Sequence, residues 1–296
     1  MTTYFAQWAW RGAEHVVANV RITVSHGVIS EVIDNATKQD GDVVVTGLVM
    51  PGFVNAHSHA FHRALRGRTH GGTGDFWSWR TPMYEVANRL TPDSYRELAT
   101  MTFAEMVLSG ITGVGEFHYI HHNTDGTKYK NPNEMGLAMV QAAQRAGIRI
   151  ALLDAAYLHA ALDKPEPLAE QKRFSDGNID AWLDRVDALG EGGDGWTVGM
   201  APHSVRAVHP RELEEIVANR HGKVVHLHVS EQPAENAACL AATGMTPTQV
   251  LDNVGLLGPH MTAVHATHLT DTDISLLGNS RTCVCLCPTT ERDLAD

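Results

Sequence analysis

Three histidines fall within six residues in VNAHSHAFH, which spans Val54 to His62 and follows an apolar run that predicts a β-strand. His57 and His59 are two residues apart, so their side chains leave the same face of an extended strand, with roughly 6.5 to 7 Å between the Cα atoms. Neutral imidazole is a good zinc ligand, and a pair on one strand is partly pre-organised to bind an ion. The two residues are therefore candidate metal ligands.

A second histidine pair, His226 and His228, lies in the segment VVHLHVSEQ. The spacing again puts both imidazoles on one strand face, and it leaves open which of the two would bind a metal. Glu231 follows three residues after His228 and offers a carboxylate for proton transfer. His265 ends a further apolar run in the segment VHATH. Together these residues suggest a metal site with an acid-base group beside it.

The elements that would position these residues are seven short apolar runs. The segments between them carry the N-cap, proline and glycine residues that are typical of helix ends. Strands that alternate with helices indicate a parallel sheet, whose carboxyl ends share one rim. The sequence therefore predicts an α/β fold, a TIM-like (β/α)8 barrel that is one strand short in this chain. The predicted strands are Gly52–His57, Thr112–His118, Arg149–Ala155, Trp196–Ala201, Lys223–Val229, Thr262–His265 and Thr282–Leu286.

The first fifty residues have a different pattern, with short alternating runs and turn residues between them. This pattern predicts short strands, and we expect residues 1–50 to form part of a small β-sandwich domain. Residues 51–296 would be a metal-dependent hydrolase barrel that stops before its last strand. Within this part, Thr91 is the predicted N-cap of a helix with Pro92 at its first position, and Gly147 follows a helical run.

The composition excludes several classes of partner. A net charge of −11 over 296 residues, without a cluster of basic residues, argues against binding to nucleic acid or to an anionic membrane. No segment reaches the roughly 18 to 20 apolar residues of a membrane span, and the N-terminus does not resemble a signal peptide. We expect a cytoplasmic protein that acts on a small molecule.

Three of the four cysteines, Cys283, Cys285 and Cys287, alternate along the last predicted strand. Structural zinc knuckles present cysteines from a turn at a different spacing, so we interpret these three as small buried strand residues.

Six motifs occur in one order along the chain: HSHAFHRAL, FWSWRTPMY, EFHYIHH, APHSVRAV, HLHVSEQ and VHATH. In this order they resemble the zinc-dependent amidohydrolase superfamily, and within it the N-formimino-L-glutamate iminohydrolase family of histidine degradation. The resemblance runs from about Pro51 to the end. The HxH pair is shared across the superfamily, whereas the combination of FWxWR with EFHYxHH is much more specific to this family.

The resemblance implies a role for each matching residue. His57, His59 and His228 would bind one Zn²⁺, although Fe²⁺ or another divalent metal suits the same ligands. Glu231 would transfer protons, and His265 would polarise the attacking water or the intermediate. The residues implied to bind the substrate are His62, Arg80, Tyr119, His203 and Arg206; His62 stands where some members have glutamine. The family also suggests a homodimer.

The family's last strand carries an aspartate that completes the zinc site, and no predicted strand after Leu286 supplies it. Asp293 and Asp296 lie in TTERDLAD, and we interpret them as loop or helix-start residues.

The implied reaction is the zinc-dependent hydrolysis of N-formimino-L-glutamate to N-formyl-L-glutamate and ammonia. Arg80 and Arg206 suit the two carboxylates of this small dianionic substrate, because guanidinium binds carboxylate bidentately. One alternative is another aminohydrolase of the superfamily, acting on guanine or a cytosine-like ring. The other is a zinc-binding protein without catalytic activity.

Overall fold

The computed structural model of the chain describes residues 1–12, 14–69 and 76–294. The chain divides into two compact units, Met1–Phe53 and Val54–Asp296. The first unit contains a four-stranded sheet in the order β3-β2-β1-β4. Its strands are β1 (Thr2–Ala9), β2 (Val17–Ser25), β3 (Val28–Ile33) and β4 (Val43–Val49). The neighbours β1/β2 and β2/β3 are antiparallel, whereas β1/β4 is parallel.

The second unit is built on a sheet in the order β12-β11-β10-β9-β7-β6-β5. The neighbours β6/β7, β7/β9, β9/β10, β10/β11 and β11/β12 are parallel. Each of these seven strands overlaps one of the seven predicted from the sequence. The two-residue strand β8 (Gly192–Gly193) pairs antiparallel with β9. The bounds are β5 (Phe53–Ser58), β6 (Ile111–His118), β7 (Arg149–Ala156), β9 (Trp196–Pro202), β10 (Val225–Val229), β11 (Met261–His265) and β12 (Cys283–Cys285).

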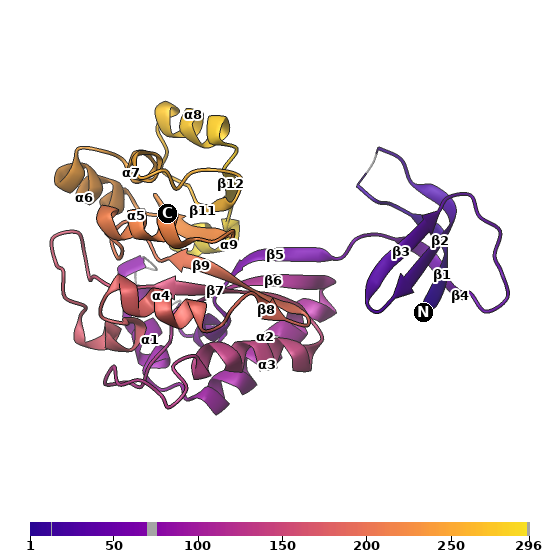
Figure 1. Cartoon of the computed structure of the whole chain (residues 1–296), viewed down its shortest axis with the longest axis horizontal. Helices are drawn as coiled ribbons and strands as arrows, with labels where there is room; N and C mark the ends of the chain where they lie inside the picture. Colours follow the sequence, from indigo (N-terminus) through magenta and orange to yellow (C-terminus); the bar gives the residue numbers. More distant parts are fainter. Residues whose placement is uncertain (13, 70–75, 295–296) are drawn as a thin grey trace. The chain divides into compact units, whose positions relative to one another are not determined.

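Helices connect successive strands and cover the outside of the sheet, with α2 and α3 lying together beside β6 and β7 (Figure 1). This is the TIM-like barrel arrangement that the sequence predicts. The α-helices are α1 (Phe76–Ala87), α2 (Pro92–Leu108), α3 (Glu134–Ala146), α4 (Ile179–Asp187), α5 (Pro210–Asn219), α6 (Pro233–Thr243), α7 (Pro247–Asn253), α8 (Asp271–Ser280) and α9 (Pro288–Leu294). Two 3₁₀ helices, η1 (Ala60–Leu65) and η2 (Ala169–Phe174), lie between strands and helices.

The helix ends follow the local sequence signals. The Thr91 side chain accepts a hydrogen bond from the Ser94 backbone N–H, and the Ser94 side chain accepts one from the Thr91 backbone N–H. Pro92 occupies the first turn of α2. Helix α3 ends at Gly147, which has a left-handed φ of 78°. These observations confirm the predicted boundaries.

Close packing between β5 and β6 depends on Gly115. A Cβ atom at this position would lie 2.6 Å from the backbone oxygen of Ala56, a contact that real Cβ atoms do not make. Glycine therefore allows β6 to approach the strand that carries His57, and the residues that follow it on β6 are buried.

A buried ion-pair network joins β7 to α4. Arg185 donates to Asp154 Oδ2 at 2.6 Å and to Asp176 Oδ2 at 2.9 Å, and its side chain is 3% exposed. Trp182 donates from Nε1 to Asp154 Oδ1 at 3.0 Å. The two carboxylates thus share one cation inside the protein, where each charge is costly without a partner.

The prediction that the cysteine run is buried is wrong in part. Cys283 is exposed, and Cys285 and Cys287 are half-buried. The reason is that β12 stands at one end of the described sheet order, so only β11 covers it from the side.

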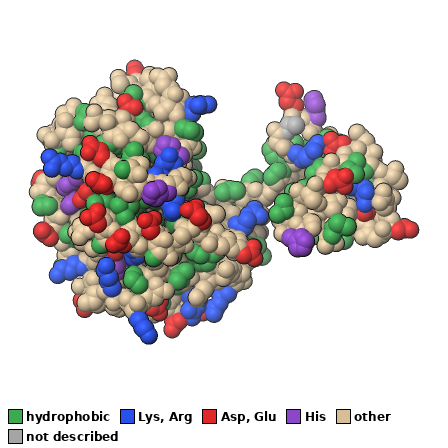
Figure 2. Space-filling view, viewed as in Figure 1, with side chains coloured by type: hydrophobic (Ala, Val, Ile, Leu, Met, Phe, Trp, Pro, Cys, Tyr) green, Lys and Arg blue, Asp and Glu red, His purple; other side chains and the backbone are tan. Residues whose placement is uncertain are grey.

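On the visible face of the barrel unit, acidic and basic side chains are interspersed (Figure 2). Among the described residues, no helix is both long enough and apolar enough to cross a bilayer.

Candidate active site

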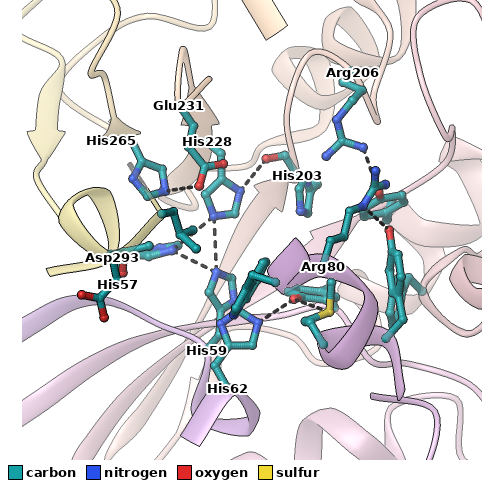
Figure 3. A pocket seen from close by; sticks show the side chains of 18 of the residues that line it. His57, His59, His62, Arg80, His203, Arg206, His228, Glu231, His265 and Asp293 are labelled. Atoms are coloured by element: carbon teal, nitrogen blue, oxygen red, sulfur yellow. Dashed lines mark hydrogen bonds and ion pairs between the residues drawn. The ribbon is translucent and has the colours of Figure 1, made fainter. Parts of the chain in front are cut away.

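A pocket opens at the carboxyl ends of the barrel strands, and it brings together every site residue that the sequence predicts. His57, His228, His265 and Glu231 lie on one side of the pocket, and Arg80 and Arg206 lie on the other (Figure 3). The predicted residues that line it are His57, His59, His62, Arg80, Tyr119, His203, Arg206, His228, Glu231 and His265. Barrel geometry explains the convergence, because strands far apart in sequence end on a common rim.

His57, His59 and His228 form a triangle of Nε2 atoms. The distances are 3.1 Å between His57 and His59, 3.3 Å between His59 and His228, and 3.2 Å between His228 and His57. Ligands about 2.0 to 2.1 Å from a tetrahedral zinc ion would be spaced about 3.3 to 3.4 Å apart. A ring nitrogen of His265 lies within 4.8 Å of those of His57 and His228. This cluster can hold one metal ion.

The protonation of the rings supports this interpretation. His59 Nδ1 faces the Phe117 carbonyl at 2.9 Å, and His228 Nδ1 faces the His203 carbonyl at 2.9 Å. A carbonyl oxygen only accepts, so in the neutral ring each Nδ1 carries the hydrogen and each Nε2 presents a lone pair. Burial lowers the pKa of His59 to about 4 and the pKa of His228 well below its ordinary value. Lone pairs that face each other at this range repel unless a cation lies between them.

Glu231 and His265 stand beside the triangle at the ends of β10 and β11. His265 Nε2 is 3.5 Å from Glu231 Oε1. The backbone at and next to these residues is strained, with a positive φ of 51° at Ser230, 68° at His265 and 53° at Ala266. Residues other than glycine rarely adopt this conformation, and where they do they often lie at functional sites. The sharp turns place both side chains over the pocket.

Each arginine in the pocket is held by a tyrosine. Arg80 donates from Nε to the Tyr84 hydroxyl at 2.8 Å, and Arg206 donates from Nη1 to the Tyr157 hydroxyl at 2.9 Å. Each guanidinium also lies over the ring of its tyrosine, at 5.3 Å and 5.7 Å from the centroid. The pocket therefore presents two positioned cations, which can bind two anionic groups of one ligand.

The remaining predicted residues lie between these two groups. The His62 Nε2 atom is 3.0 Å from the Tyr119 hydroxyl, and burial lowers the pKa of His62 well below its ordinary value. The His203 ring lies 4.6 Å from the Tyr157 ring and 4.8 Å from the His228 ring. Both histidines are positioned to contact a ligand that spans the pocket. His226, the other histidine of β10, does not line it.

Sequence reasoning missed several residues of the site. Tyr84 follows Arg80 by four residues on α1, a spacing that could have indicated the contact. Glu235 accepts the Glu231 backbone N–H at 3.2 Å, and burial raises its pKa to about 7. Asp293, which we expected to be a loop or helix-start residue, lies on α9 and lines the pocket. Asp296 lies outside the described residues.

This chain has its polar cluster at the carboxyl ends of the strands of a parallel barrel, which is where the active sites of barrel enzymes lie. The sequence profile of the amidohydrolase family matches residues 48–296, and the chain belongs to that family.

The proteins that this chain resembles include two curated relatives and one solved structure. Formimidoylglutamate deiminase from Pseudomonas aeruginosa is 36% identical over 285 residues, which cover 94% of this chain and 62% of that protein. An 8-oxoguanine deaminase from the same organism is 27% identical, over 84% of this chain and 55% of that protein. The crystal structure of an amidohydrolase from Brucella melitensis superposes with a TM-score of 0.89 at 32% identity, over 100% of this chain and 67% of that one. The chain thus spans about three fifths of the length of the curated relatives.

Proposed function

We propose that this chain carries the active site of a zinc-dependent hydrolase that converts N-formimino-L-glutamate into N-formyl-L-glutamate and ammonia, a step of histidine degradation. The single observation that supports it best is the layout of one pocket. A histidine triangle lies on one side, and two tyrosine-held arginines lie on the other. A small dicarboxylate with a hydrolysable C=N group has the matching arrangement of charge.

His57, His59 and His228 would hold the metal, because their Nε2 lone pairs converge and burial keeps the rings neutral. A zinc ion bound there supplies an acidified water molecule near neutral pH. We prefer zinc for a site of neutral imidazoles, although Fe²⁺ suits the same ligands.

Glu231 is the group that moves protons in this proposal. Water adds to the formimino carbon, and the Glu231 carboxylate takes one of its protons and delivers it to the imine nitrogen. Glu231 then takes the second proton from the resulting hydroxyl group and delivers it to the same nitrogen, which is the departing group. The C–N bond to that nitrogen then breaks, ammonia leaves, and the former water oxygen becomes the formyl carbonyl. His265, 3.5 Å from Glu231 on the same side of the pocket, polarises the oxygen as negative charge develops.

Arg80 and Arg206 bind the two carboxylates of the substrate and fix the distance from these groups to the histidine triangle. The chain as a whole has a net charge of −11, but this pocket contains two cations, and their positive charge favours the binding of a dianion. His62, Tyr119 and His203 lie between the arginines and the triangle, where they would contact the formimino group and the adjoining chain.

The relative named as an 8-oxoguanine deaminase makes a ring aminohydrolase the principal rival. A neutral ring gives the two arginines no carboxylates to bind, and this disfavours the rival.

The test compares ammonia release by the full-length, zinc-loaded protein from N-formimino-L-glutamate, 8-oxoguanine, guanine and cytosine. We expect turnover of the first alone. Glu231→Gln should retain zinc and lose activity by at least about 100-fold, because general acid-base catalysis contributes on that order. Turnover of a ring substrate alone would support the rival, and stoichiometric zinc with no turnover of any substrate would support a binding protein.

A further inference from the structure

The two arginines of the pocket are joined by a continuous chain of buried hydrogen bonds. Arg80 donates to the Tyr84 hydroxyl at 2.8 Å, and Arg206 donates to the Tyr157 hydroxyl at 2.9 Å. Gln171, which lies on η2, donates from Nε2 to both hydroxyls, at 2.9 Å each. The amide therefore connects two residues that lie 87 and 14 positions away in the sequence.

The orientation of the Gln171 amide is fixed by its partners. Its Oε1 accepts the Leu168 backbone N–H at 2.9 Å, which leaves the two hydrogens on Nε2 for the two phenol oxygens. The side chain is completely buried, at 0% exposure. Both N–H hydrogens of the Gln171 amide and its carbonyl oxygen therefore have partners. An amide with its oxygen and nitrogen exchanged would place Nε2 against the Leu168 N–H, so it could not satisfy the same groups.

Both tyrosines transmit this constraint to the arginines. Tyr84 and Tyr157 are 9% and 3% exposed, and each phenol oxygen accepts one bond from Gln171 and one from its arginine. Burial alone would raise the pKa of Tyr157, but the charges of Arg206 and Arg80, together with the hydrogen bonds to Arg206 and Tyr84, lower the pKa overall. The five side chains therefore form one connected network of hydrogen bonds.

We infer that Gln171 is a positioning residue that sets the spacing between Arg80 and Arg206, and so makes the pocket selective for dicarboxylates of one length. This inference rests on the proposed function, since it assigns the two arginines to two carboxylates of one substrate. Gln171 would determine the substrate preference without contacting the substrate, because it lies behind the tyrosines and does not line the pocket.

The test measures binding of succinate, glutarate and adipate, which carry their carboxylates at increasing separation, and of glutaramate, which keeps one carboxylate of glutarate. The protein is the zinc-loaded, full-length chain. In the natural sequence we expect glutarate to bind most tightly. In Gln171→Leu, glutarate should bind about 10-fold more weakly, glutaramate about 3-fold, and the preference among the three diacids should fall to about 2-fold.

A matched control separates positioning from stability. Gln249 makes the same capping contact as Gln171, accepting the Thr246 backbone N–H at 3.0 Å. Gln249 lies on α7, however, and its side chain does not bond to Tyr84 or Tyr157, the two partners of Gln171. Gln249→Leu removes this capping bond and should leave all four affinities unchanged. Equal loss of affinity in the two variants would overturn the inference, as would an unchanged diacid preference in Gln171→Leu.

A second variant covers the case in which Gln171→Leu does not fold. Tyr84→Phe with Tyr157→Phe keeps Gln171 and its capping bond but removes both phenol oxygens. It should lose the diacid preference to the same extent, and adding Gln171→Leu should cause no further loss, because the residues act in one network. A preserved preference in the double variant would contradict the inference.

Kinetics with N-formimino-L-glutamate distinguish this inference from the proposed function. Gln171→Leu should raise KM about 10-fold and change kcat less than about 3-fold. If the natural protein does not hydrolyse this compound but Gln171→Leu abolishes the diacid preference, the proposed function fails and the positioning role stands. If hydrolysis occurs and the preference is unchanged, only the positioning role fails.

Discussion

The Glu291 carboxylate lies 3.3 Å from Nδ1 of His265, on the side of the ring opposite to Glu231. The same oxygen, Oε1, accepts the Cys287 backbone N–H at 2.8 Å at the start of α9. Glu291 is therefore anchored by the backbone and in turn orients the His265 ring. His265 thus lies between two carboxylates, one facing the pocket and one behind it.

Glu291→Gln removes the negative charge behind His265 but keeps an oxygen for the Cys287 N–H. We expect kcat for N-formimino-L-glutamate to fall about 10-fold while KM stays within about 2-fold, because the variant leaves the arginines untouched. Steady-state kinetics measure both parameters. Glu291→Asp, which restores the charge, should recover part of kcat; a change confined to KM would show that Glu291 acts on substrate binding instead.

Replacing His57, His59 or His228 by alanine should weaken zinc binding by more than about 100-fold, because each supplies one corner of the nitrogen triangle. Elemental analysis of the purified variants measures the bound zinc. His226→Ala is the matched control, since His226 lies on the same strand but does not line the pocket. Loss of zinc from His226→Ala as well would show that the triangle is not the metal site.

Neutral substitution of either arginine should mainly raise KM for N-formimino-L-glutamate. The expected loss for Arg80→Gln or Arg206→Gln is on the order of 1.5 to 3 kcal/mol, the usual range for a hydrogen bond to a charged group. Arg63→Gln, which removes a cation paired with Glu105 outside the pocket, serves as the control. Unchanged kinetics in both pocket variants would exclude these arginines from carboxylate binding.

Glu116 should make the fold less stable as the pH rises from about 4.5 to 8. Burial raises the pKa of Glu116 to about 8 from an ordinary value of 4.5, although the Ala60 backbone N–H donates to its Oε1 at 2.7 Å and opposes the shift. In this window the folded protein holds a proton that the unfolded chain has released. Its contribution to stability is complete below the lower pKa and is lost as the pH approaches the higher one.

Glu116→Gln cannot ionise, so its stability relative to the natural protein should increase with pH across this window, by at most about 1.4 kcal/mol per pH unit. Urea unfolding of metal-free protein at several pH values measures the difference. Glu166→Gln, which changes an exposed carboxylate elsewhere, controls for the effect of the substitution itself. A constant difference for Glu116→Gln would mean that Glu116 is ionised in the fold.

Arg185→Met should destabilise the fold by about 3 to 5 kcal/mol, because it leaves the buried Asp154 and Asp176 carboxylates without their shared cation. The midpoint of urea unfolding measures this change. Arg145→Met breaks an exposed pair with Glu97 and should cost less than about 1 kcal/mol. Equal effects in the two variants would show that the buried network adds no stability beyond a surface pair.

The sequence by itself determined the strands, the parallel barrel and the histidine pair His57 and His59 at the end of one strand. These features are local, because a few neighbouring residues are enough to define them. Examples are strand periodicity, a helix cap such as Thr91 and a pair such as His57 and His59. Residues that end parallel strands also meet on one rim, so their convergence followed from the fold class.

Only the tertiary structure decided which histidine of β10 joins the triangle. His226 and His228 share a strand face, and the spacing of two residues could not separate them. His228 is at the rim, opposite His57, whereas His226 lies about 7 Å further down the strand. Height within the barrel depends on the register of neighbouring strands, which no local pattern records.

The same holds for the groups that support the site. Gln171 meets Tyr84 across 87 residues, and Glu116 meets Ala60 across 56. No periodicity or motif links positions so far apart; their contact depends on how helices and strands pack, and on the need for each buried polar group to find a partner. The sequence named the residues that can bind a metal and a carboxylate, and the packed barrel alone fixed what holds them in place.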